Sequence, residues 1–325
     1  IFRVRDANMV LPTLTSAGYL WPSPRGSGTR LNPGVGTITA AFWNGDSYYN
    51  AFVLQVRKQI RRGLQAGGSY TWGKSIDTSS GSMEGDEYSN AISSPLWFDT
   101  RVNRGQSDYD ITHSLKITYS WQLPSPRLDF AAAGWALNGW QVGGVFEAST
   151  GVPFTPGFGG DPLGVNSTDT NVNVPGVVST PECKTLVDPG NFTNYIKTNC
   201  LEVPRSTPAI AAQCVNAADP VTGAPDPATC LNLRGNLGRN ALTGPGQVSM
   251  NVTVFKNNYL RSINDVFNVQ FRAEFFNIFN RPNISAPLEN KNVFDSRGNR
   301  LASAGLAEST QTSPRNIQLA IRVIW

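Results

Sequence analysis

The sequence predicts an all-β fold: an antiparallel portion of a transmembrane β-barrel, about seven or eight strands wide, with long extracellular loops. Three observations support this prediction. Seven stretches alternate apolar and polar residues, the connections between them alternate in length, and aromatic residues gather near the ends of the stretches. Glycine (31) and proline (22) are plentiful and charged residues make up only 15%, which favours strands and long loops over helices.

Each of the seven stretches presents one apolar and one polar face, as half-exposed strands do. In "AFVLQVRKQI", for example, Phe52 and Leu54 alternate with Gln55 and Arg57. In chain order the apolar faces comprise Phe52, Leu54, Val56 and Ile60; Leu64, Ala66, Tyr70 and Trp72; Ile111, Leu115, Ile117, Tyr119 and Trp121; Trp140, Val142, Phe146 and Ala148; Val248, Met250, Val252 and Val254; Phe267, Val269, Phe271, Ala273 and Phe275; Ile317, Leu319, Ile321, Val323 and Trp325. The predicted strands cover residues 50–62, 63–76, 110–122, 139–150, 247–256, 266–280 and 315–325. An eighth strand would come from residues 1–20.

The connections between these strands fall into two sets that alternate along the chain. The short or moderate connections are 61–63, 123–139 and 257–265, and the longer ones are 77–109, 151–246 and 281–314. All the longer connections therefore leave from one end, as extracellular loops do in a membrane barrel whose periplasmic turns are short. A soluble β-domain is the alternative, because the inner face of a sandwich alternates in the same way.

The aromatic residues distinguish these two possibilities. Under this alternation of loops, one set lies at the periplasmic strand ends and a second set lies towards the outer ends, which predicts the two aromatic girdles of a membrane barrel. The periplasmic set is Tyr119, Trp121, Trp140, Phe267 and Trp325, and the outer set is Phe52, Tyr70, Trp72 and Phe275. A sandwich core has no reason to sort aromatic residues to strand ends.

Charged residues on the polar faces are expected to line a polar lumen. They are Arg57, Lys116, Glu147, Arg272, Glu274 and Arg322. Lys58 is an exception on the apolar face, but it lies close to the Arg61–Gly63 turn, so its long side chain can reach the membrane interface.

All four cysteines, Cys183, Cys200, Cys214 and Cys230, fall inside the predicted loop 151–246. None has the Cys-x-x-Cys spacing that zinc sites favour. We therefore expect two disulfides formed in an oxidising compartment. Pairing of neighbours, 183 with 200 and 214 with 230, is the simplest of three connectivities.

Four segments resemble the C-terminal barrel region of TonB-dependent outer-membrane receptors. They are "YYNAFVLQVRKQIRRGLQAGGSYTWGKSID", "DYDITHSLKITYSWQLP", "NGWQVGGVFEASTGVPFTP" and "FNVQFRAEFFNIFNRPN". The similarity covers roughly residues 45–325 and is closest to Oar-like receptors with a carboxypeptidase-regulatory-like N-terminal domain. On this resemblance the whole chain, 1–325, is the C-terminal part of one transmembrane β-barrel domain.

The resemblance implies a barrel of about 22 strands with an N-terminal plug inside it, and a short box that binds the energising protein TonB. The chain shows no candidate for plug or box, and Ile1 reads as a processed, truncated or mid-chain start. We therefore expect the remaining strands to come from a longer polypeptide or from other chains. In proteins of this kind a last strand that ends on an aromatic residue, here Trp325, resembles the signal read by the barrel-assembly machinery.

Several other functions have little support in the sequence. No block of Lys and Arg points to nucleic acid, and no stretch approaches the ~18 apolar residues of a membrane-spanning helix. The only histidine, His113, shares the face of Ile111 and Leu115, so we expect an interfacial residue rather than a catalytic one, and no enzyme. Acidic loops at 82–90 and 149–173 could bind calcium, but solvated turn residues are the simpler interpretation and no cofactor is expected.

These observations predict a protein of the bacterial outer membrane whose partners are lipid, the rest of its barrel and plug, the TonB system and the assembly machinery. The first hypothesis is uptake of a scarce or large nutrient: a siderophore, cobalamin, an oligosaccharide or a peptide. The second is a structural or adhesive barrel that does not transport. The loop at 151–246 is expected to be an external lid or ligand-contacting flap, or else a protective surface elaboration.

Overall fold

A computed structural model gives the fold of the chain. The residues that it describes are 3–16, 18–20, 30–36, 38–42, 45–60, 63–80, 99–126, 131–159, 175–204, 207–212, 235–260, 262–263, 266–295 and 298–325.

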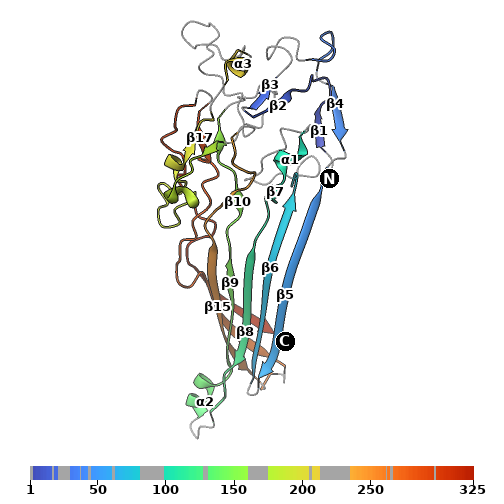
Figure 1. The fold of residues 1–325 in the computed structure, drawn as a ribbon. Helices are drawn as coiled ribbons and strands as arrows, with labels where there is room; N and C mark the ends of the chain where they lie inside the picture. The colour runs from blue at the N-terminus through green and yellow to red at the C-terminus, as the bar shows by residue number, and fades with distance from the viewer. Residues whose placement is uncertain are drawn as a thin grey trace.

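Seven long antiparallel strands lie side by side in chain order and form one sheet (Figure 1). They are β5 (Ser47–Ile60), β6 (Leu64–Asp77), β8 (His113–Gln122), β9 (Trp140–Ser149), β15 (Gln247–Tyr259), β16 (Asn268–Phe276) and β18 (Asn316–Ile324). A two-residue strand, β7 (Gly105–Gln106), pairs with the end of β6. Each predicted strand range overlaps one of the seven, and the prediction of an all-β, antiparallel fold is confirmed. β5 begins earlier than predicted, and β6 and β15 end later.

Two predicted ranges are too long, because polar side chains end the strand pairing early. The range 266–280 is too long, because β16 stops at Phe276 and Asn277 takes a left-handed conformation with φ of 48°. The Asn277 side chain closes this turn by accepting from the backbone N–H of Arg281 at 3.0 Å. The range 110–122 begins too early, because the Asp110 carboxylate accepts the backbone N–H of Ser75 at 2.6 Å and β8 starts only at His113.

Two glycines with a left-handed backbone lie in the connections at the other end of the strands. Gly63, between β5 and β6, has φ of 76°, and Gly139, immediately before β9, has φ of 82°. This left-handed region costs glycine little and other residues more. A Cβ at Gly139 would also lie 2.3 Å from the carbonyl oxygen of Asn257, which a packed structure does not tolerate.

The shorter strands form separate small pairings above the main sheet (Figure 1). They are β1 (Arg3–Asp6) with β4 (Thr39–Phe42), β2 (Thr13–Thr15) with β3 (Gly18–Leu20), β10 (Pro153–Phe154) with β14 (Leu242–Thr243), β11 (Gly157–Phe158) with β17 (Asn292–Phe294), and β12 (Gly176–Val177) with β13 (Leu201–Glu202). The expectation that residues 1–20 add an eighth long strand is therefore wrong, because their strands pair with each other and with β4.

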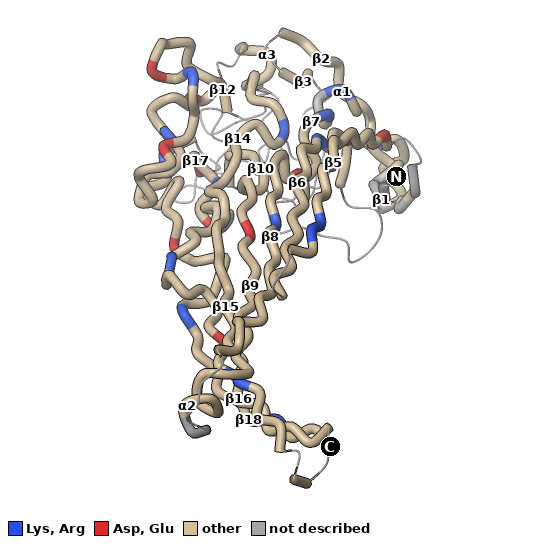
Figure 2. The backbone as a smooth tube through the Cα atoms, turned by 90° about the horizontal axis from the view of Figure 1, so that it is seen from below, with Lys and Arg blue, Asp and Glu red and all other residues tan. Residues whose placement is uncertain are grey.

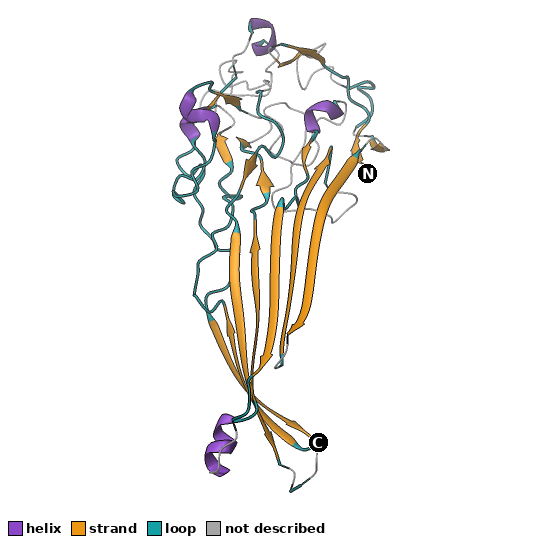
Figure 3. Ribbon diagram, turned by 60° about the horizontal axis from the view of Figure 1, so that its bottom comes forward, coloured by secondary structure: helices purple, strands orange, loops and turns teal. Residues whose placement is uncertain are grey.

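The helices are short and lie at the two ends of the sheet (Figure 3). Near the small strands are α1 (Thr100–Asn103), α3 (Pro208–Ala211) and the 3-10 turns η1 (Pro181–Lys184) and η2 (Thr198–Cys200); at the opposite end lies α2 (Ala131–Leu137). None of the described helices has the length and apolar character needed to cross a membrane.

The sheet is open within the described residues. The edge strand β5 pairs only with β6, and the other edge strand β18 pairs only with β16. The structure therefore shows an antiparallel wall rather than a closed barrel, and the total number of strands in the complete barrel stays a prediction.

The hydrophobic core lies beyond one end of the long strands. Two connections build it: residues 150–246, between β9 and β15, and residues 277–315, between β16 and β18. We call their described parts the loop cap. Its buried apolar residues are Phe154, Phe158, Tyr195, Ile196, Leu201, Leu237, Leu242, Ala286, Val293, Phe294 and Ala304.

Candidate functional site: two sheet faces and the loop cap

Strand register places the apolar stripes of all seven strands on one face of the sheet. Side chains that are paired in register point to the same face. One such row crosses the whole sheet, and its neighbours repeat the pattern. In strand order the row is Ile60, Leu64, Trp121, Val142, Val254, Ala273 and Leu319.

This apolar face is exposed rather than covered by a second layer of the protein. Leu319 is 80% exposed and Phe271 is 46% exposed. Val252, in the middle of β15, is only half-buried. A continuous apolar surface of this size is unfavourable in water and marks contact with a membrane or a partner.

The predicted aromatic residues fall on or beside this face. Phe52 pairs directly with Trp72, and Tyr119 lies against Gly144, where a Cβ would be 2.8 Å from the tyrosine ring. In register, Tyr70 pairs with Leu115, Trp121 with Val142, Trp140 with Lys256, and Phe275 with Ile317. Phe267 and Trp325 flank the ends of β16 and β18, and Trp325 is largely exposed. Their role as interface girdles stays a prediction.

His113 is held by two of these aromatic residues. Its Nδ1 lies 2.8 Å from the Tyr70 hydroxyl, and its ring stacks with the rings of Tyr70 and Trp72. Register places it opposite Trp72, on the apolar face. The histidine therefore belongs to an aromatic cluster near the loop-cap end of the sheet.

The opposite face carries all the side chains that we predicted to line a lumen. Lys116 and Glu147 are register partners on β8 and β9 and form an ion pair at 2.6 Å. Arg272 contacts Glu274 at 3.4 Å and stacks over the Phe255 ring, 4.6 Å from its centroid. The two remaining residues, Arg57 and Arg322, share this face by register with Gly67 and Gln270.

A groove of about 450 Å³ lies across β5, β6 and β8. It is lined by polar residues, among them Arg57, Gln65 and Ser120, and also by Ala66 and Tyr119. Charged residues are scattered over the molecule rather than gathered in one block (Figure 2). The sheet thus separates an apolar surface from a sparsely charged polar one.

Three lysines of the long strands share the register of the apolar face: Lys58, Lys74 and Lys256. Lys74 is exposed near the end of β6, where it pairs with Asn50. Lys58 was recognised in the sequence and is exposed on the edge strand β5. Lys256 was missed, although it follows Val252 and Val254 in the same alternation. Register places it between Trp140 of β9 and Phe271 of β16.

The loop cap joins connections that are far apart in the sequence. β11 and β17 pair in parallel, and the Phe158 and Phe294 rings stack with centroids 4.9 Å apart. The Tyr195 hydroxyl donates to the carbonyl of Thr243 at 2.8 Å, and burial raises the pKa of Tyr195 to about 12. The backbone N–H of Tyr195 also bonds the carbonyl of Gly305 at 2.9 Å. The cap is therefore one folded unit rather than two independent loops.

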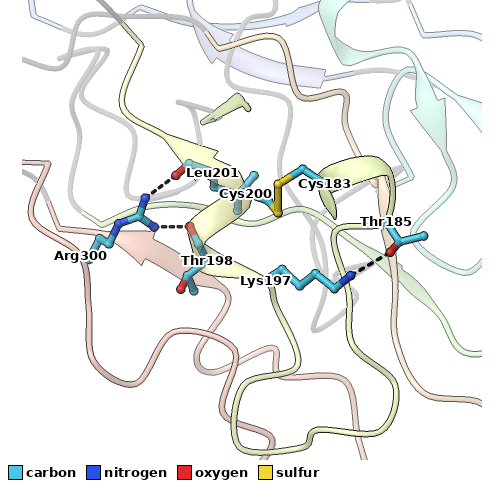
Figure 4. The surroundings of a disulfide bond; sticks show 7 residues. All are labelled: Cys183, Thr185, Lys197, Thr198, Cys200, Leu201 and Arg300. Atoms are coloured by element: carbon cyan, nitrogen blue, oxygen red, sulfur yellow. Dashed lines mark hydrogen bonds between the residues drawn. A yellow bond between two sulfur atoms is a disulfide. The ribbon is translucent and has the colours of Figure 1, made fainter. Parts of the chain in front are cut away.

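A disulfide lies within the loop cap (Figure 4). Cys183 and Cys200 are joined, with Cα atoms 5.3 Å apart. Beside the bond, Arg300 donates to the carbonyls of Thr198 and Leu201. Of the three connectivities left open, the structure shows the one that pairs 183 with 200, while Cys214 and Cys230 lie outside the described residues.

Arg239 anchors the loop cap to the main sheet. Its guanidinium pairs with Asp77 at the end of β6 and, at 2.8 Å, with Asp108, which follows β7. All three side chains are at least nine-tenths buried. The neighbouring Asn240 donates to Asp108 at 2.6 Å and to the backbone carbonyl of Gln106 at 2.7 Å. This buried network fixes the cap above the strands.

No cluster of His, Cys, Asp and Glu able to hold a metal ion occurs in the part of the chain that the structure describes. The acidic loop 82–90 and residues 160–173 of the second acidic loop lie outside that part.

The fold and its two faces define a class: an antiparallel, up-and-down sheet with an exposed apolar surface on one side and polar side chains on the other, the construction of a transmembrane β-barrel wall. Residues 2–318 match the family model of the outer membrane beta barrel domain, and the chain belongs to this family. Searches of curated proteins and of solved structures find no match. Membership of this family places the protein in the bacterial outer membrane.

Proposed function

We propose that the protein is a TonB-dependent receptor that takes up a scarce or large nutrient, such as a siderophore, cobalamin, an oligosaccharide or a peptide. The observation that carries this proposal is the loop cap, which two distant connections fold around one core and which Arg239 joins to β6. A folded surface held rigidly above barrel strands suits ligand capture, because binding residues commonly lie on loops positioned by a rigid scaffold.

In this proposal the seven strands form part of the barrel wall. The apolar face meets lipid, and the face with Lys116 and Glu147 meets the lumen or a plug. The free edges of β5 and β18 would leave backbone groups unpaired in hydrocarbon, at several kcal/mol each. Strands from the rest of a longer polypeptide, or from other chains, therefore complete the barrel. A plug-bearing part contacts TonB, and the assembly machinery reads the end of β18 at Trp325.

A structural or adhesive barrel that does not transport is the second candidate. The Cys183–Cys200 disulfide and the extensive cap core favour it, because both make a durable exposed surface. Neither candidate assigns a catalytic role to His113, whose ring is held between Tyr70 and Trp72.

Nutrient uptake by a strain that lacks the full-length protein tests the first candidate. Labelled members of the four nutrient classes are offered to this strain and to a strain that lacks TonB. We expect both strains to lose energised uptake of the same class. Complementation with a variant in which a short turn replaces residues 151–246 should leave uptake lost, although the protein still reaches the membrane. The matched control replaces α2 at the opposite end with a turn and should restore uptake.

Unchanged uptake of all four classes would exclude the receptor. Loss of surface adherence in the same strain, dependent on the loop cap, would then support the second candidate.

A further inference from the structure

Lys256 is a buried cation on a face that contacts lipid. The residue is only 8% exposed, and its register partners are Trp140 and Phe271. Its ammonium group donates to the Asn258 side-chain oxygen at 2.8 Å and to the Asn257 carbonyl at 3.4 Å. No acidic side chain among the described residues forms an ion pair with it. A buried ammonium served only by neutral oxygens still favours an anion nearby.

Helix α2 covers this lysine from one side. The Lys256 ammonium lies 5.3 Å from the centroid of the Trp135 ring, within the range of a cation–π contact. The helix is fixed in place because the Trp140 indole N–H donates to the Ala136 carbonyl at 2.8 Å. Trp135 and Leu137 nevertheless remain more than half exposed. Exposed Trp and Leu at a strand end are typical of the membrane interface.

An apolar groove of about 630 Å³ opens beside the lysine. It is lined mainly by Trp140, Val254, Lys256, Phe271, Leu319 and Ile321, from four strands. By strand register, all six side chains lie on the apolar face of the sheet. Arg272 also borders the groove, but it belongs to the opposite face of the sheet, where it pairs with Glu274. The groove therefore combines an apolar surface suited to an acyl chain with the ammonium group of Lys256 at its margin.

We propose that this groove binds a single phospholipid with an anionic head group, such as phosphatidylglycerol. Its phosphate accepts a hydrogen bond from Lys256, and one acyl chain lies along Phe271, Leu319 and Ile321. Charge complementarity selects this occupant: the site offers a donor and a positive charge to the head group and hydrocarbon to the tail. Basic pockets on membrane-embedded surfaces bind anionic head groups in this way. By the alternation of loop lengths, α2 lies at the periplasmic end, so the bound lipid belongs to the periplasmic leaflet.

Native mass spectrometry of the full-length, delipidated protein tests the proposal. Phosphatidylglycerol, phosphatidylcholine with the same acyl chains, and inorganic phosphate are added in separate experiments. We expect phosphatidylglycerol to bind about tenfold more tightly than phosphatidylcholine, as for one charge-assisted hydrogen bond, and inorganic phosphate not to bind. In Lys256→Met the two lipids should bind about equally, whereas Lys256→Arg should keep the preference for phosphatidylglycerol.

Lys58→Met is the matched control, because Lys58 is also on the apolar face but lies outside this groove. We expect it to retain the preference for phosphatidylglycerol. A wild-type protein that binds both lipids equally overturns the proposal, and this result does not depend on the folding of any variant. A preference that survives in Lys256→Met, or that is lost equally in Lys58→Met, overturns it as well. Binding of inorganic phosphate as tightly as phosphatidylglycerol overturns it too, because the groove would then contribute nothing through the acyl chain.

Discussion

At the scale of single residues, Arg239 forms the buried ion pairs that join the loop cap to the main sheet. Arg239 lies near the end of the connection of nearly a hundred residues between β9 and β15. It pairs with two carboxylates that precede β9 in the chain, Asp77 at the end of β6 and Asp108 after β7. Removing one partner of a buried ion pair is costly, because the remaining charge loses both water and its counter-ion. Here a single substitution would remove the Arg239 guanidinium from two buried carboxylates, Asp77 and Asp108.

We therefore expect Arg239→Met to destabilise the attachment of the cap by about 3–5 kcal/mol. The effect is measured by heating the purified protein and monitoring unfolding of the cap by limited proteolysis at each temperature. Adding Asp77→Asn should recover part of the loss, since one uncompensated charge disappears.

Arg300→Met is a suitable control for this substitution. Arg300 is also a cap arginine, but it is exposed and donates to the backbone carbonyls of Thr198 and Leu201. Because the acceptors are neutral carbonyls and the site is exposed to water, losing these bonds costs roughly 1.5 kcal/mol, less than breaking a buried ion pair. Equal effects of Arg239→Met and Arg300→Met would show that the buried ion pairs do not hold the cap.

At the scale of elements, the long strands could be predicted from the sequence and the loop cap could not. The strands are local: each carries its own alternation of apolar and polar residues, because one face of the sheet is apolar. The cap core joins Phe158 to Phe294 and Tyr195 to Gly305, and each pair is separated by more than a hundred residues. The two connections that build the cap show no regular alternation of apolar and polar residues. Nothing in the neighbourhood of either partner indicates the other. The end of β16 was missed for a local reason, since the apolar pattern continues through Ile278 and Phe279 while the backbone turns at Asn277.

The disulfide makes a prediction for the cap as an element. Cys183 and Cys200 are separated by 17 positions, and closing a loop of that size stabilises a fold by about 3 kcal/mol in the chain-entropy model. The double substitution Cys183→Ser with Cys200→Ser should therefore speed cleavage of the cap by protease while the long strands stay intact. Mass spectrometry of the fragments locates the new cleavage sites.

Lys197→Met tests whether any change near the disulfide has this effect. Lys197 donates to the Thr185 hydroxyl at 3.0 Å beside the disulfide, in an exposed position (Figure 4). This single exposed bond should matter little, so cleavage should stay at the wild-type rate. The disulfide would have no stabilising role if reduction and the double substitution both left the rate unchanged.

At the scale of the whole molecule, every other property depends on which face of the sheet meets lipid. Leu319 and Gln318 are neighbours on β18 and point to opposite faces, where they pair with Ala273 and Glu274. Both residues are exposed, so their burial within this chain does not distinguish them. A membrane does, because a cation on the lipid face costs about 2–4 kcal/mol near the bilayer centre and less near the interfaces, whereas one facing the lumen costs little.

Leu319→Arg should therefore lower the stability of the folded protein in phospholipid vesicles by up to about 4 kcal/mol, while Gln318→Arg should change it by less than about 1 kcal/mol. Urea unfolding, read from the heat-modifiable mobility of the folded form, measures both. The comparison is matched, because the two variants share a strand, a level in the membrane and an added charge. If Gln318→Arg proves to be the costly change, the faces are reversed, and the lipid site at Lys256 would then face the lumen. Equal and small effects would mean that neither face is embedded, because water would then solvate both arginines.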